Sequence, residues 1–194
     1  MPHLTPGHGP ILTMPAFDLN ALLALLPLAE LPRTGWVQTG LPPGIAPETI
    51  ASHGHMVALL VMQLGSQVDP PLDVHRAVAL AVAHDAAEAW TGDLPKPAAH
   101  GLPKGAKKDL EWSMIEQKAP HLGPYWLECE SMTSREARLV KLCDTLQMGL
   151  FAIRLKRAGH TGMGSFMESV QALDASEFAV TAELQALLVQ EWSG

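Results

Sequence analysis

The chain has 194 residues, of which 47% are hydrophobic and 17% are charged, and its formal net charge is −7. This length predicts one domain with a sizeable core. The acidic balance excludes the broad basic surface of a duplex nucleic-acid binder, so we expect no stable nucleic-acid partner. The two cysteines, Cys129 and Cys143, are too few for a disulfide framework, which favours a reducing, cytoplasmic setting.

The N-terminal segment, residues 1–15, is rich in proline and glycine and carries two histidines, which predicts a flexible arm ahead of a domain over 16–194. The arm has no basic stretch followed by an apolar one, so it does not resemble a secretion signal. The apolar segment 21–31 is too short to span a bilayer and is interrupted by Pro27 and Glu30. We therefore expect a core helix there and no membrane association.

Capping residues and apolar periodicity predict an all-α fold, a single compact helical domain of about six or seven helices. Asp18, Asp73 and Ser134 precede three of the helices as N-caps, and Gly92 and Gly159 end two of them. The predicted helices cover about 19–30, 47–67, 74–90, 105–118, 135–158, 164–172 and 176–192. No segment alternates as a half-buried strand does.

Two loops rich in proline and glycine separate these helices, over 33–48 and 92–105. The second of them follows the helix over 74–90 and is placed to lie over a site. The segment 119–134 is predicted to be irregular or a short helix.

Ionisable residues stand on apolar surfaces of three different predicted helices. His53 has apolar neighbours one turn away, and Asp144 lies on a face with Val140 and Met148. His84, Asp85 and Glu88 fall near the end of one helix, where 3.6-residue periodicity directs them to one side. Each residue alone is compatible with an ordinary core or surface role. Together, two imidazoles and two carboxylates suit a divalent metal, because burial of such groups is costly unless they are paired or bind an ion.

The order and spacing of these residues resemble the HD-domain metal-dependent phosphohydrolases, whose signature is H…HD…D. The resemblance extends over about 30–160 and is closest to the 5′-deoxynucleotidase subgroup, of the HD-domain-containing 2 type. It rests on "RTGWV" (33–37), "ETIASH" (48–53), "HDAAEAWTGDLPKP" (84–97) and "LVKLCDTLQ" (139–147).

The resemblance implies a phosphohydrolase that acts on deoxyribonucleoside 5′-monophosphates with one divalent metal ion, drawn from Co, Mn, Zn, Ni, Fe or Mg. It also implies a homodimer. The metal ligands it implies are His53, His84, Asp85 and Asp144.

The other implied roles concern the substrate and the proton transfer. Glu88 would handle the proton or orient the water, and Asp93 would be a further catalytic residue that touches the sugar hydroxyl. Arg33 would hold the phosphate, for which its planar guanidinium is suited. Trp36 would line the sugar side, although a core position is an equally good interpretation of this residue.

Some features depart from the family pattern. Ser52 stands before the first ligand histidine, where an acidic residue is common, and the loop over 38–47 is longer than usual. His55 lies about 200° around the helix from His53, so we leave it out of the site.

Two alternative functions remain open at the level of the sequence. The first is hydrolysis of deoxynucleoside triphosphates to tripolyphosphate, for which Lys96, Lys104, Lys107 and Lys108 could supply cations, although a solvated face is the favoured interpretation of these lysines. The second is a scaffold that binds a nucleotide without turnover, which the complete set of candidate ligands disfavours.

Overall fold

The computed structural model describes residues 18–194, and the predicted arm over 1–15 lies outside the described residues. Within that range the chain is all-α, and its only extended pairing is an isolated bridge between Pro32 and Thr49. The helices are α1 (Leu19–Leu23), α2 (Pro27–Glu30), α3 (Thr34–Gln38), α4 (Ile50–Gly65), α5 (Val74–Ala83), α6 (Glu88–Thr91), α7 (Lys96–His100), α8 (Ala106–Lys118), the 3-10 turn η1 (Pro120–Leu122), α9 (Gly123–Ser131), α10 (Arg135–Arg157), α11 (Gly164–Gln171) and α12 (Ala179–Ser193). The all-α prediction is confirmed, with more and shorter helices than expected.

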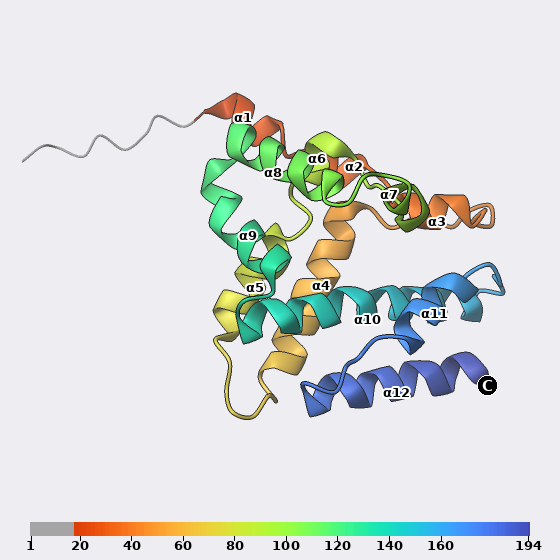
Figure 1. Cartoon of the computed structure of the whole chain (residues 1–194). Helices are drawn as coiled ribbons and strands as arrows, with labels where there is room; N and C mark the ends of the chain where they lie inside the picture. The colour runs from red at the N-terminus through yellow and green to blue at the C-terminus, as the bar shows by residue number, and fades with distance from the viewer. Residues whose placement is uncertain (1–17) are drawn as a thin grey trace, which may run out of the picture.

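The long helix α10 runs through the middle of the molecule (Figure 1) and packs against α4, α5, α11 and α12. One apolar cluster lies where α4, α5 and α10 meet, around Val57, Leu80 and Leu139, which are all fully buried. A second cluster lies between α10, α11 and α12, around Leu146 and Met167. Helix α10 therefore belongs to both clusters. This packing fixes the position of the polar residues that α10 carries into the interior.

The predicted capping residues begin their helices as expected. The side chains of Asp18, Asp73 and Ser134 accept hydrogen bonds from backbone N–H groups in the first turns of α1, α5 and α10. Helix α4 begins three residues later than predicted. The Thr49 side chain caps it, and the Ser52 hydroxyl in turn accepts from the Thr49 N–H. Ser52 is thus an exposed capping residue in this chain.

The prediction of one continuous helix over 19–30 is wrong, because this segment divides into α1 and α2. Leu25 and Leu26 donate to carbonyls three residues back, and Pro27 has no N–H with which to continue an α-helical ladder. A short helix that the sequence did not predict, α3, lies inside the expected loop over 33–48.

The predicted helix over 74–90 also divides, and the division falls at the candidate site. Helix α5 ends at Ala83, and residues 84–87 continue as a tight turn in which the N–H of Ala86 donates to the Ala83 carbonyl. The N–H of Glu88 likewise donates to the carbonyl of Asp85, three residues back. Because side chains three residues apart eclipse in such a turn, Asp85 and Glu88 face the same side. A continuous helix, which the sequence predicted, would separate them by a larger angle. Gly92, with φ of 71°, ends this region as expected.

Candidate active site

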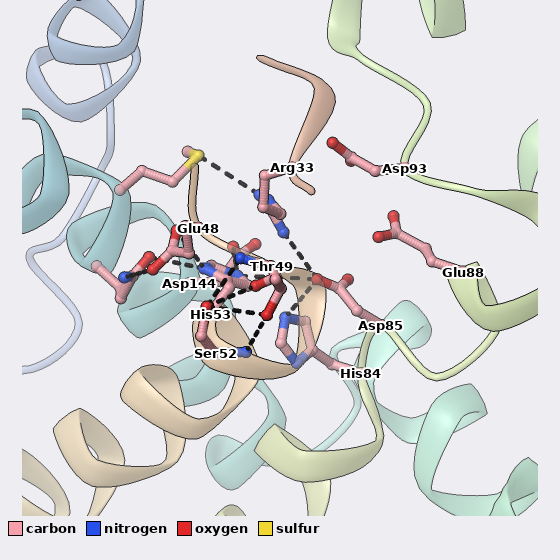
Figure 2. A network of polar contacts seen from close by, with 12 residues as sticks. Arg33, Glu48, Thr49, Ser52, His53, His84, Asp85, Glu88, Asp93 and Asp144 are labelled. Carbon is pink, nitrogen blue, oxygen red and sulfur yellow. Dashed lines mark hydrogen bonds and ion pairs between the residues drawn. The ribbon is translucent and has the colours of Figure 1, made fainter. Parts of the chain in front are cut away.

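Four segments bring the predicted site residues together (Figure 2). His53 comes from α4, His84 and Asp85 follow the end of α5, and Asp144 comes from α10. Arg33 lies on the segment just before α3, which is tied to the start of α4 by the bridge between Pro32 and Thr49. Residues more than 110 positions apart in the sequence thus share one site.

The predicted metal ligands face one another. Ligand atoms of His53, His84 and Asp144 all lie within 4.8 Å of one another, which is close enough to hold one ion. Asp85 adjoins the same group, since its Oδ2 lies 3.2 Å from His84 Nε2 and 3.7 Å from His53 Nε2. Two imidazole nitrogens and two carboxylates form a donor set that suits a divalent transition metal.

The orientation of His84 supports metal binding independently of the spacing. Its Nδ1 lies 2.6 Å from the Ala81 carbonyl, which can only accept, so Nδ1 carries the hydrogen. Its Nε2 is buried and has no hydrogen-bond partner among the described residues. A buried nitrogen in this position is costly unless it binds a proton or a cation, and a metal ion would serve.

The charges at the site also favour a cation. Burial acts to raise the pKa of the Asp144 carboxyl, but Lys141 and His53 hold that pKa well below its usual range. The pKa of Asp85 is likewise lowered despite burial, through His84 and Arg33. Burial opposes protonation of His84, yet the two carboxylates raise its pKa to about 9. The field that favours a proton on His84 favours a divalent cation in the same place.

Arg33 reaches the site, where its Nη1 donates to Asp85 Oδ2 at 2.8 Å. Burial alone would lower the pKa of the guanidinium, but Asp85 and Asp144 raise it further above its already high value. Arg33 therefore places a permanent positive charge beside a candidate metal ligand, within reach of an anion bound there.

Asp93 joins two segments that are distant in sequence. Its Oδ2 accepts a short hydrogen bond from the N–H of Thr34, and its backbone carbonyl accepts from the Thr34 hydroxyl at 2.8 Å. Asp93 thereby caps the first turn of α3 and fixes the segment that carries Arg33. Its contact with a sugar hydroxyl stays a prediction.

Glu88 is 3% exposed, and its Oε2 has no hydrogen-bond partner among the described residues. Burial, with repulsion from Asp85 and Asp93, raises the pKa of its carboxyl to about 9, which keeps it protonated at neutral pH. Lys107 of α8 was expected only as a general cation, but its Nζ lies 3.5 Å from Glu88 Oε1 and 3.2 Å from Glu111 Oε1. The loop over 92–105 and α8 thus approach the site from the side of Glu88.

Trp36 is 1% exposed, and its ring stacks on Phe166 at a centroid distance of 3.8 Å. These are the contacts of a core residue, and the predicted contact with a sugar stays a prediction. Its Nε1 donates to Glu48 Oε2 at 3.2 Å. His55 is exposed, as its angle around α4 from His53 predicts.

Two buried polar residues near the site were not singled out from the sequence. Glu48 is 6% exposed and Gln147 is 3% exposed, and they bond to each other behind His53. A signal for Gln147 was present, because it follows Asp144 by three residues and so shares its side of an apolar helix.

A family model, curated relatives and solved structures all agree with the HD-domain resemblance of the sequence. A family model described as an HD domain matches residues 27–184. The 5′-deoxynucleotidase HDDC2 of Homo sapiens is 32% identical over 161 residues, which cover 79% of this chain and 73% of that protein. The 5′-deoxynucleotidase hdd1 of Schizosaccharomyces pombe is 29% identical over 151 residues, which cover 72% of this chain and 73% of the relative.

Solved structures agree with the fold. The PH0347 protein from Pyrococcus horikoshii superposes with a TM-score of 0.78 and 26% identity, over 90% of this chain and 99% of its own. The HD phosphohydrolase DatZ of cyanophage S-2L, solved with dA and one catalytic Zn²⁺ ion, gives a TM-score of 0.57 and 25% identity, over 89% of this chain and 96% of that protein.

Proposed function

The chain belongs to the HD-domain family, and from that premise we propose that it is a metal-dependent phosphohydrolase of deoxyribonucleoside 5′-monophosphates. The observation that carries the proposal is the convergence of His53, His84 and Asp144 around one position, beside Asp85 and the buried Glu88. The names of the relatives in man and fission yeast, and the dA bound to the phage protein, support a deoxynucleotide as the substrate.

In this proposal His53, His84, Asp85 and Asp144 would hold one divalent ion, which would supply Lewis-acid activation of a water molecule and of a phosphoryl oxygen. Arg33 binds the phosphate through its guanidinium and offsets negative charge on the transferring group.

Glu88 acts as the general acid in this scheme. Hydrolysis breaks the bond between phosphorus and the 5′ oxygen, and the departing oxygen needs a proton. A carboxyl group whose pKa is raised to about 9 holds that proton at neutral pH and can donate it. Asp93 supports the geometry by capping α3, and we propose that it also contacts the sugar hydroxyl.

A triphosphate substrate is the second candidate, and one observation keeps it in view. Lys104, Lys107 and Lys108 line a surface hollow at the start of α8, and Lys107 reaches Glu88. A chain of phosphates leaving the site on that side would meet these cations.

Product analysis separates these possibilities. We would incubate the protein with deoxynucleoside mono- and triphosphates and Mn²⁺ or Co²⁺, and identify the products by chromatography. Release of inorganic phosphate and a deoxynucleoside from monophosphates is the expected result. Tripolyphosphate would identify the second candidate, and release of nothing from any nucleotide would favour a non-catalytic scaffold.

We also propose that the protein is a cytoplasmic homodimer. Three apolar side chains, Met56, Leu59 and Met62, lie along one exposed side of α4, with 43%, 44% and 52% of their surfaces exposed. Cys129 and Cys143 are both free thiols, consistent with a reducing compartment. No helix in the range 18–194 has the length and apolarity to cross a membrane. Light scattering coupled to gel filtration measures the mass, and a monomer that persists at high concentration would contradict the dimer.

A further inference from the structure

A buried chain of hydrogen bonds lies behind His53, on the side away from the candidate ligands (Figure 2). His53 Nδ1 lies 2.6 Å from Gln147 Oε1, and Gln147 Nε2 donates to Glu48 Oε1 at 2.5 Å. The other oxygen of Glu48 accepts from Trp36 Nε1 at 3.2 Å. All four residues are less than 7% exposed, so water does not compete for these bonds.

The chemistry of the groups gives this chain of bonds a direction. The indole N–H of Trp36 can only donate, and an ionised carboxylate can only accept. Glu48 therefore faces the amide nitrogen of Gln147, which leaves the amide oxygen facing His53. An amide oxygen accepts, so Nδ1 of His53 carries a hydrogen, which leaves Nε2 as the ring atom that can bind a metal ion.

Nε2 faces the candidate metal position. It lies 3.1 Å from Asp144 Oδ1, at hydrogen-bond distance, and 3.7 Å from Asp85 Oδ2, the oxygens of two other proposed ligands. The opposite tautomer would direct an N–H at the ion and could not bind it.

Glu48 is itself held by the fold. Its backbone carbonyl accepts from the Arg33 N–H at 2.7 Å, at the isolated bridge that joins the two segments. Stacking of Trp36 on Phe166 fixes the indole that completes the network. The carboxylate thus has little freedom to turn away from Gln147.

We propose that Glu48 and Gln147 are positioning residues that set the imidazole tautomer of His53 and so determine the affinity of the site for its metal. The inference rests on the proposed metal site and assigns a role to two residues outside the ligand set. Neither residue touches the candidate metal position or the substrate, so both act through His53.

The test uses a single variant, in which an amide replaces the carboxylate, and a double variant, in which the carboxylate and the amide exchange positions. In Glu48→Gln, an amide replaces the carboxylate with almost no change of shape. The new NH₂ group then needs an acceptor, so the Gln147 amide turns its oxygen toward position 48 and its NH₂ toward His53. The imidazole must accept at Nδ1 and present an N–H at Nε2. Metal affinity should fall by about 10- to 100-fold.

The double variant Glu48→Gln/Gln147→Glu exchanges the two groups and should restore binding. The carboxylate at position 147 accepts from His53 Nδ1 and from the amide at position 48, whose oxygen accepts from Trp36. Every donor again has an acceptor, and the lone pair of Nε2 returns to the metal position. A purely structural role would not predict this rescue, because the double variant carries more changes than the single one.

Two readouts apply to the full chain after treatment with a chelator. Titration with Co²⁺, followed by the visible absorption of the bound ion, gives the affinities of the three proteins. Long-range ¹⁵N–¹H NMR of the histidine rings reports the hydrogens of His53 without metal, and we expect hydrogen on Nδ1 in the wild type and none on Nδ1 in Glu48→Gln.

The outcomes are distinguishable. Equal Co²⁺ affinity of the wild type and Glu48→Gln, or a double variant as weak as the single one, would overturn the positioning role. A wild-type ring without hydrogen on Nδ1 would overturn it without reference to metal. If the wild type itself bound no Co²⁺ while the tautomers were as expected, the proposed metal site would fail, and with it the effect on affinity.

Discussion

Replacement of Glu88 by glutamine should have opposite effects on activity and on stability. The carboxyl group is 3% exposed, and folding raises its pKa from 4.5 to about 9, chiefly through burial. Glutamine keeps the shape but has no proton to donate, so we expect kcat to fall by about 10²- to 10⁴-fold, the usual contribution of a general acid.

The effect on stability follows from linkage between folding and proton binding. Because the folded protein holds the Glu88 proton more tightly than the unfolded chain does, this proton stabilises the fold fully below pH 4.5, and the stabilisation is lost as the pH rises toward about 9. The loss is about 1.4 kcal/mol for each pH unit in that interval, hence about 3 kcal/mol between pH 5 and pH 7. Glutamine does not ionise and does not suffer this loss. The free energy of unfolding of Glu88→Gln, relative to that of the wild type, should therefore rise by about 3 kcal/mol between pH 5 and pH 7.

Urea unfolding of the chelator-treated proteins at pH 5 and pH 7 measures this difference. Glu116→Gln, which changes an exposed carboxylate on α8, is the matched control and should follow the wild type at both pH values. A difference between Glu88→Gln and the wild type that did not change with pH would refute the argument that burial keeps Glu88 protonated.

Four further predictions concern the surroundings of the site, two glycines and the buried thiols. Lys107→Met removes a cation that lowers the pKa of Glu88, so the limb of the pH–rate profile that depends on Glu88 should move to higher pH. Gly35→Ala places a Cβ 2.9 Å from Phe166 Cζ and should destabilise the protein in urea by about 1–3 kcal/mol. Gly54→Ala, whose Cβ would have no such neighbour closer than 4.0 Å, should instead stabilise it by about 0.5–1 kcal/mol. Both cysteine thiols have a pKa raised to about 12, mainly by burial, and should react with a disulfide reagent at pH 8 only as fast as the protein unfolds.

Each of these results has a contrary outcome. Lys108, the exposed neighbour of Lys107, is the control for the pH profile, and equal profiles for Lys107→Met and Lys108→Met would remove Lys107 from the account. A Gly35→Ala variant as stable as the wild type would show that Phe166 yields without cost. Thiol labelling that outpaces unfolding would show that the cysteines are accessible in the folded state.

The sequence predicted the caps and the long helices because those signals are local. Asp73 and Ser134 cap the helices that follow them as expected, and α10 agrees with its prediction to within one residue. Ionisable residues on apolar helices indicated a metal site, and the family resemblance implied four ligands; ligand atoms of three of them lie within 4.8 Å of one another. These residues stand out because ionisable groups on apolar helices are unusual.

Other features depend on contacts between distant segments and could not be predicted from local pattern. The helix breaks after Ala83, although the residues around the break are rich in alanine, which favours helix. Local propensity therefore does not explain the tight turn, and we attribute it to tertiary packing. Asp93 caps α3 from 59 residues away. Glu48 was assigned to the first turn of a helix, whereas the structure places it before α4, where it faces Gln147.

The central claim is that one divalent ion, held by His53, His84, Asp85 and Asp144, is required to release phosphate from a deoxyribonucleoside 5′-monophosphate. The most direct measurement is a titration of Mn²⁺ or Co²⁺ into chelator-treated protein, with phosphate release followed at each addition. We expect no release without metal, a rise that saturates at one ion per chain, and no rise for Asp144→Ala. Full activity in the chelated protein, or an Asp144→Ala variant as active as the wild type, would contradict it.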